Sequence, residues 1–184
     1  MLVMLPYEIK SKQSGIVLAL VLVFIFIFAV LSVWALNLCL LANKLSHNQF
    51  HKLSISMAAE EVLKNAEAHL NKSDTISCNI PMTTTQELLH HSLTWWQSSV
   101  SCAGNFQHFQ YYYVIEFLGY DPCALVGQSS ASYFRVTVLA TTQKKLGARV
   151  FLQSTFVKPN KIALVCAGNK YSISAGRQTW RELN

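Results

Sequence analysis

The sequence predicts an α+β fold in which one long N-terminal helix, transmembrane at first and amphipathic later, packs on a small antiparallel β-sheet head. Three observations predict this fold. Apolar residues form a continuous run near the N-terminus, 65 residues without glycine or proline contain that run, and alternating polarity follows in the second half of the chain. A length of 184 residues leaves room for one modest domain and an anchor.

The membrane anchor is predicted from a run of 21 residues, 16–36, in which Ser32 is the only clearly polar residue. As a helix this run spans about 30 Å, the thickness of the hydrocarbon core of a bilayer. A cleavable signal peptide has a shorter apolar region that ends in small residues, whereas Trp34 and the residues after it keep their bulk. Because Lys10 and Lys12 precede the run, we expect a cytoplasmic N-terminus and an exported remainder.

The helix is expected to continue beyond the bilayer, because neither glycine nor proline occurs between Gly15 and Pro81. Glu60 precedes Lys64 by four residues, which favours an exposed ion pair. The polar residues 71–74 predict the end of the helix. Apolar residues at helical spacing prolong one side of it: Phe50, Leu53, Met57, Ala59, Val62, Leu63, Ala66 and Leu70.

The second half of the chain changes to the two-residue period of half-buried antiparallel strands. The apolar face of these strands and the apolar side of the helix would bury each other. A short helix is predicted at 86–89, strands at 111–118, 133–142 and 149–157, a hairpin connection at 143–147 and a fourth strand at 162–166. Residues expected on the buried face of the sheet are Phe134, Val136, Val138, Ala140, Val150, Leu152 and Phe156.

Four cysteines lie in the predicted head and a fifth, Cys39, lies in the apolar region. An even number of well-separated cysteines is typical of two disulfides in an oxidising compartment such as a periplasm. The sequence leaves three pairings open, of which Cys78–Cys102 with Cys123–Cys166 is favoured because it closes local segments. A zinc site needs closely paired ligands such as C-x2-C, and these cysteines are far apart in the sequence.

The sequence predicts no enzyme, cofactor or metal. No Ser/His/Asp or Cys/His arrangement, phosphate loop or carboxylate pair has the required spacing. His47 and His51 have the spacing of two ligands for one metal, but no carboxylate or cysteine nearby completes a site. The net charge of +6 is compatible with DNA as a partner, yet the basic residues are scattered, which favours an ordinary solvated surface.

Aromatic clusters allow two interpretations. Trp95 and Trp96 follow His90 and His91, and three consecutive tyrosines occupy 111–113. Such residues in a small head are more often part of the core or of an interface than a surface that binds a ligand. We therefore expect structural aromatics first and an adhesive patch second.

A basic leader, Gly15, a hydrophobic helix that begins at once, an amphipathic continuation and a disulfide-bearing antiparallel head resemble the type IV pilins. The segments that resemble minor pilins of the PilX type in particular are Gly15-Ile16-Val17-Leu18 and residues 58–67, 113–116, 133–138 and 150–154. The resemblance covers most of the chain, and the N-terminal third is its specific part.

The resemblance implies that a prepilin peptidase cuts between Gly15 and Ile16 on the cytoplasmic side and methylates the new amine. Residues 1–15 would then be the leader, 16–42 the transmembrane and assembly helix, 43–75 its amphipathic extension and 76–184 the periplasmic head. The implied partners are the lipid bilayer, the peptidase, the inner-membrane assembly platform and other minor and major pilins. The subunit would pass from the inner membrane into the pilus fibre.

Leu20 departs from the pattern of the major pilins, which carry a glutamate at this fifth mature position. In that family the glutamate is thought to neutralise the N-terminal amine of an adjacent subunit, and a buried charge without a partner is costly. Several minor pilins of the PilX type also lack it. The departure therefore implies a subunit at or near the filament tip that primes or caps assembly, in support of adhesion, twitching motility or DNA uptake.

Two alternatives remain open. A tip pseudopilin of type II secretion also lacks the glutamate, although the best-known one has a much larger inserted domain. A permanently anchored periplasmic binding module would use the tryptophan and tyrosine clusters as its ligand surface. The first predicts secretion in place of surface fibres, and the second predicts an intact N-terminus at Met1.

Overall fold

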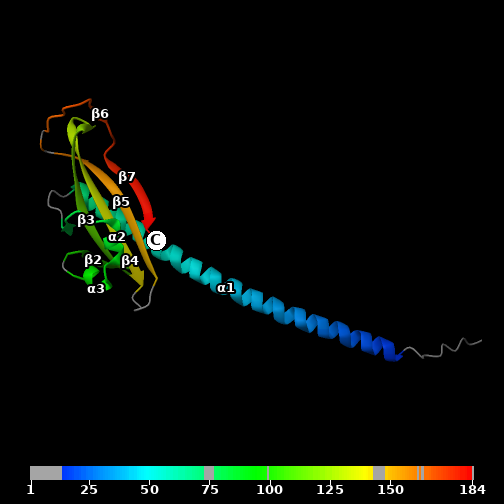
Figure 1. Ribbon diagram of the computed structural model, residues 1–184. Helices are drawn as coiled ribbons and strands as arrows, with labels where there is room; N and C mark the ends of the chain where they lie inside the picture. The colour runs from blue at the N-terminus through cyan, green and yellow to red at the C-terminus, as the bar shows by residue number, and fades with distance from the viewer. Residues whose placement is uncertain are drawn as a thin grey trace, which may run out of the picture. The chain divides into compact units, whose positions relative to one another are not determined.

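The structure is a computed structural model that describes residues 14–72, 77–98, 100–142, 148–160, 162 and 164–183 (Figure 1). The chain divides into two compact units, residues 1–49 and 50–184. One helix, α1, spans Ser14–Lys72 and so belongs to both. The predicted long helix is confirmed, and the absence of glycine and proline after Gly15 explains why it is unbroken.

In the first unit, every side chain from residue 16 to residue 49 is exposed. Within the described residues this is the one helix that is long and apolar enough to cross a membrane, beginning at Ile16. The apolar side chains of residues 16–36 lie on all sides of the helix, which is compatible with a single-pass membrane anchor.

The head is built on one seven-stranded sheet with the order β1-β3-β4-β5-β7, and β2 and β6 also pair with β3. The pairs β3–β4, β4–β5 and β5–β7 are antiparallel, whereas the two-residue strands β1 and β6 pair in parallel with β3. The strands are β1 (Asn79–Ile80), β2 (Cys102–Phe106), β3 (Phe109–Val126), β4 (Ser129–Thr142), β5 (Arg149–Pro159), β6 (Tyr171–Ser172) and β7 (Gly176–Leu183).

The main core lies between α1 and one face of this sheet. The side chains that α1 buries begin at Ile55 and end at Leu70. The sheet contributes the residues that the alternation predicted, so their shared buried face is confirmed: Phe134, Val136, Val138, Ala140, Val150, Leu152 and Phe156.

The predicted helical stripe was wrong in its first three members. Phe50, Leu53 and Met57 are 60–68% exposed, while Ile55 is fully buried. At about 100° per residue, these three residues project from the side of α1 opposite the one that the sheet covers.

The other face of the sheet is covered by two short helices, α2 (Thr85–His90) and α3 (Leu93–Trp96). The predicted short helix at 86–89 is thus present, and a capping box between Thr84 and Glu87 fixes its start. The second core contains Ile80, Leu88, Trp96, Tyr112, Val114 and Leu139.

The predicted fourth strand at 162–166 was wrong. Residues 162 and 164–166 have no regular secondary structure, and Val165 is 91% exposed. The open edge of β5 is instead taken by β7, which pairs with it from Phe151 to Val157. The predicted hairpin connection at 143–147 lies outside the described residues, although β4 and β5 pair antiparallel on either side of it. The described part of α1 ends at Lys72, within the predicted end at 71–74.

Candidate functional site

The exposed apolar half of α1 carries the residues that the sequence singled out for assembly. Ile16 is 73% exposed and Leu20 is 53% exposed. The hydroxyl of Ser32 donates to the carbonyl of Phe28 at 2.7 Å, so this polar group is satisfied within the helix. A satisfied hydroxyl removes much of the cost of placing residue 32 in an apolar environment.

The predicted leader lies almost wholly outside the described residues. Of the predicted cleavage pair, Gly15 belongs to the first turn of α1, and Ile16 is the first residue whose exposure is described. Leu20 follows one helical turn later.

An ion-pair cluster joins the buried half of α1 to the C-terminal strand β7. The guanidinium of Arg177 lies 2.7 Å from Glu60 Oε1 and 2.9 Å from Glu67 Oε1. Glu67 is buried and also accepts a hydrogen bond from the hydroxyl of Ser154 at 2.5 Å. Partial burial acts to lower the pKa of Arg177, but the hydrogen bonds and charges of the two carboxylates outweigh it and raise that pKa.

This cluster was not predicted. The sequence indicated an exposed pair of Glu60 with Lys64, but Glu60 is partly buried and reaches Arg177. Two further contacts fix the helix along its length. Lys52 lies 3.3 Å from Glu182, and the Lys158 amine donates to the carbonyl of Leu70 at 3.3 Å.

A second ion pair holds the segment that follows Cys78, the first cysteine of the head. Glu116 is fully buried, and its carboxylate accepts from Arg135 at 2.6 and 2.7 Å and from the backbone N–H of Thr83 at 2.8 Å. Arg135 also donates to the carbonyl of Thr83. A buried carboxylate with three donors is compensated for its desolvation, so Thr83 is held against the sheet.

The four cysteines of the head form two disulfides in the structure. Cys78 is joined to Cys102 at the start of β2, with 5.3 Å between their Cα atoms. Cys123 in β3 is joined to Cys166, with 4.8 Å between their Cα atoms. Of the three pairings that the sequence left open, this is the one that closes local segments.

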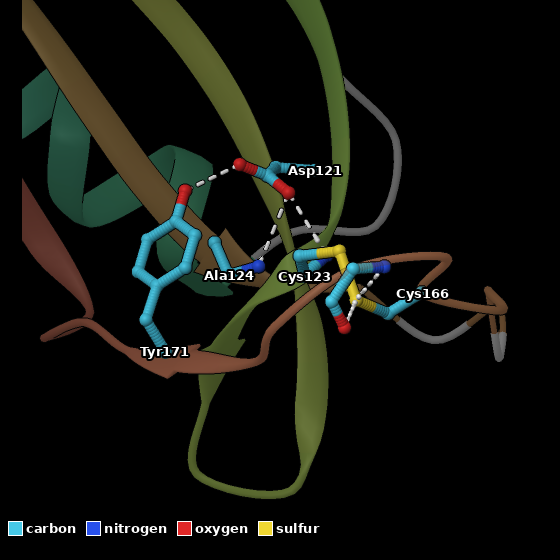
Figure 2. The surroundings of a disulfide bond; sticks show 6 residues. Asp121, Cys123, Ala124, Cys166 and Tyr171 are labelled. Atoms are coloured by element: carbon cyan, nitrogen blue, oxygen red, sulfur yellow. Dashed lines mark hydrogen bonds between the residues drawn. A yellow bond between two sulfur atoms is a disulfide. The ribbon is translucent and has the colours of Figure 1, made fainter.

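The second disulfide fastens the C-terminal loop, which here means the described residues 164–171, to the C-terminal end of β3 (Figure 2). The Asp121 carboxylate accepts from the backbone N–H groups of Cys123 at 2.9 Å and Ala124 at 3.1 Å. Its other oxygen accepts from the Tyr171 hydroxyl at 2.5 Å. The loop is therefore held at two points, by a covalent bond at Cys166 and by Asp121 at Tyr171.

The bond between these two residues shifts both pKa values. The hydrogen bond from Tyr171, followed by that from the Cys123 backbone, lowers the pKa of Asp121 below its usual value. The same bond, together with some desolvation and the negative charge of Asp121, raises the pKa of Tyr171 to about 12. The pair is therefore most stable when Asp121 is ionised and Tyr171 is protonated.

The aromatic residues have mainly structural positions. Trp96 is fully buried in the core beneath α3, whereas Trp95 is partly exposed and stacks on His91 with 3.9 Å between ring centroids. Tyr112 is buried, and Tyr111 and Tyr113 are partly buried against the main core. The structure thus places one tryptophan in the core and leaves the other at its margin.

Among the residues that the structure describes, no group of three or more histidine, cysteine, aspartate or glutamate side chains is placed to hold a metal ion. His47 and His51 both lie on the exposed part of α1.

A family model described as the C-terminal part of the type IV pilus assembly protein PilX matches residues 56–158, which is more than half of the chain. The match begins in the half of α1 that the sheet buries and ends in β5. Neither a search of curated proteins nor a search of solved structures finds a match. With its long apolar N-terminal helix and its disulfide-linked α+β head, the chain belongs to the PilX family of type IV pilus assembly proteins.

Proposed function

We propose that this protein is a minor pilin, a structural subunit that primes or caps the assembly of a type IV pilus. One observation carries the proposal: a single helix is exposed and apolar in its first half and is fixed into a folded head in its second half. Such a helix can hold the head at a membrane and later hold it on a filament. In both environments its apolar surface is removed from water.

The free-energy cost of exposing the apolar helix to water supports this proposal. The apolar side chains of residues 16–36 are exposed on the helix. Moving this part of the helix from the bilayer into water would therefore be strongly unfavourable. Transfer to a bundle of similar helices exchanges contacts with acyl chains for contacts with other pilins. The partners that we propose are therefore the lipid bilayer first and other minor and major pilins afterwards, with an inner-membrane platform that performs the transfer.

Processing at Gly15 completes the proposal. Cleavage by a prepilin peptidase between Gly15 and Ile16 would remove leader residues 1–15, and methylation would follow on the new amine. The transmembrane and assembly helix would be 16–42, its extension 43–75 and the periplasmic head 76–184. Cleavage on this side of the apolar run retains the anchor.

Leu20 supports a position at the tip. An apolar side chain at the fifth mature position offers no carboxylate for the amine of an adjacent subunit. A terminal position in the filament leaves fewer such amines to neutralise. This subunit would then determine how many pili are assembled. Adhesion, twitching motility and DNA uptake would depend on that number.

The experiment is deletion of the gene in the native bacterium, with counts of surface pili and assays of protein secretion. Loss of pili with unchanged secretion, restored by the wild-type gene, is the expected result. Loss of secretion with normal pili would instead identify a pseudopilin of type II secretion. No change in either would favour a permanently anchored binding module and contradict the proposal.

A further inference from the structure

A cavity of the head lies where α1 ends, and the assembly function does not require it. Its volume is about 680 Å³. It is lined by Asn71, Asn79, Phe117, Tyr120, Ser129, Ser132, Phe134, Lys158, Pro159, Asn160 and Ile162. These residues come from α1, β1, β3, β4, β5 and the loop after β5, so the fold brings distant segments together around one space.

One wall of this cavity is aromatic. Phe117 packs against Tyr120 with 4.7 Å between ring centroids and against Phe134 with 5.3 Å. Phe134 is buried, whereas Tyr120 is 49% exposed. The inner rings thus hold Tyr120 in place at the margin of the cavity, where an apolar face of a ligand can lie on it.

The rest of the described lining is polar and mostly uncharged. Three asparagine amides and two serine hydroxyls contribute groups that both donate and accept hydrogen bonds. Asn160 Oδ1 accepts from the backbone N–H of Ile162 at 3.2 Å, while its buried Nδ2 has no hydrogen-bond partner among the described residues.

Lys158 is the only charged residue in the described lining, and the protein itself engages its charge. Its amine donates to the Leu70 carbonyl near the end of α1 and lies 5.5 Å from the centre of the Phe134 ring. The negative end of the helix dipole and the ring face both attract this cation. The cavity therefore shows no strong preference for an anion, and its described lining has no carboxylate to attract a cation.

We propose that this cavity binds a short neutral saccharide. Sugar hydroxyls both donate and accept hydrogen bonds, which matches the amide of Asn79 and the hydroxyl of Ser129. The C–H face of a pyranose ring matches the aromatic wall that Tyr120 completes. The inference is independent of the proposed role in assembly, because the site would exist in the head whether or not the protein enters a fibre.

The test uses the full-length protein in deuterated dodecylphosphocholine, a detergent without a sugar headgroup. Saturation-transfer difference NMR is recorded with cellotriose, tri-N-acetylchitotriose and N-acetyllactosamine at millimolar concentrations, and with 3′-sialyllactose as the acidic comparison. Two variants, Tyr120→Ala and Asn79→Ala, alter the aromatic wall and one amide. Trp180→Ala is the matched control, because Trp180 is also 49% exposed but lies on β7, outside the cavity.

At least one neutral trisaccharide or disaccharide is expected to receive saturation on its ring C–H protons. Its affinity should fall about tenfold in Tyr120→Ala, the ratio that corresponds to one lost aromatic contact. It should also fall in Asn79→Ala and stay unchanged in Trp180→Ala. Absence of binding by all three neutral sugars, binding of the acidic sugar alone, or equal affinity in Tyr120→Ala would each overturn the proposal. Circular dichroism confirms that each variant is folded.

Discussion

The guanidinium of Arg177 lies 2.9 Å from the carboxylate of Glu67, which is 110 residues earlier in the chain. This contact joins the C-terminal strand to the helix that continues from the apolar N-terminal half. Glu60 lies two turns before Glu67 on the same side of α1 and completes the cluster. Arg177 therefore adds a polar contact between β7 and α1 to the apolar core that packs α1 on the sheet.

Arg177→Ala should destabilise the head strongly. The substitution leaves Glu67 buried beside Ser154 without its cation, and such a loss typically costs about 3 kcal/mol of the free energy of unfolding. The matched control is Arg149→Ala, because Arg149 is an exposed arginine of β5. That change should cost less than about 0.5 kcal/mol.

The measurement is urea unfolding of the full-length protein in detergent, followed by tryptophan fluorescence. Equal midpoints for the two arginine variants would show that the cluster does not secure β7 to α1.

Loss of the second disulfide should also lower stability. The bond between Cys123 and Cys166 closes a loop with a sequence separation of 43 residues. By the entropy of loop closure, its removal costs up to about 4 kcal/mol of the free energy of unfolding. The double variant Cys123→Ser/Cys166→Ser is compared with Cys39→Ser, which removes the free cysteine of the exposed apolar helix.

Thermal unfolding of both variants provides the measurement, and peptide mass mapping of the unreduced wild-type protein checks the pairing. Cys39→Ser should match the wild type. A double variant that melts with the wild type, or a mapped bond from Cys78 to Cys166, would contradict the structure.

The contact between Asp121 and Tyr171 should depend on pH at both extremes. The pKa of Asp121 is lowered by the bond, so its contribution is present above the usual value of 3.8 and disappears as the pH falls through the lowered pKa. The pKa of Tyr171 is raised from 10.0 to about 12, so its contribution is full below pH 10 and disappears as the pH rises to about 12.

NMR titration of ring-labelled tyrosine measures this directly. In the wild type Tyr171 should titrate near pH 12. In Asp121→Asn, which removes the charge but keeps the size, its pKa should return toward 10.0. An unchanged value in this variant would mean that Asp121 does not hold the loop.

Much of the fold could be predicted because its signals are local. The lack of glycine and proline predicted α1, and the two-residue alternation predicted which side chains of β4 and β5 face the core. β7 was missed because its half-exposed sequence, with Trp180 and Arg181 both exposed, shows no such alternation. The position of β7 depends on its pairing with β5, and no local sequence pattern indicates that pairing.

The wrong predictions also arise from contacts between segments that are distant in the sequence. Residues 162–166 are rich in apolar side chains, as a strand is, but the edge of β5 is paired with β7 instead. Glu60 has a suitable cation four residues away in Lys64, yet it pairs with Arg177, 117 residues away in the sequence. Phe50, Leu53 and Met57 continue a helical spacing but lie on the side that the head leaves exposed. In each case, the observed position of the residues depends on segments that are distant in the sequence.

Processing is the next prediction, because the proposed assembly requires cleavage before the apolar run. Gly15→Val should block cleavage, since a peptidase that reads the glycine before the cut cannot accept a branched side chain there. Ser14→Val, at the neighbouring position, is the matched control and should still be processed. Immunoblots of membrane fractions would show the unprocessed chain as the longer band in Gly15→Val only. Normal processing of Gly15→Val would contradict the predicted site.

The most direct test of the central claim is mass spectrometry of the N-terminus of this protein, isolated from sheared surface pili and from inner membranes. We predict a chain that begins at Ile16 with a methylated amine, present in both fractions. A chain that still begins at Met1 and is absent from the pili would contradict the account.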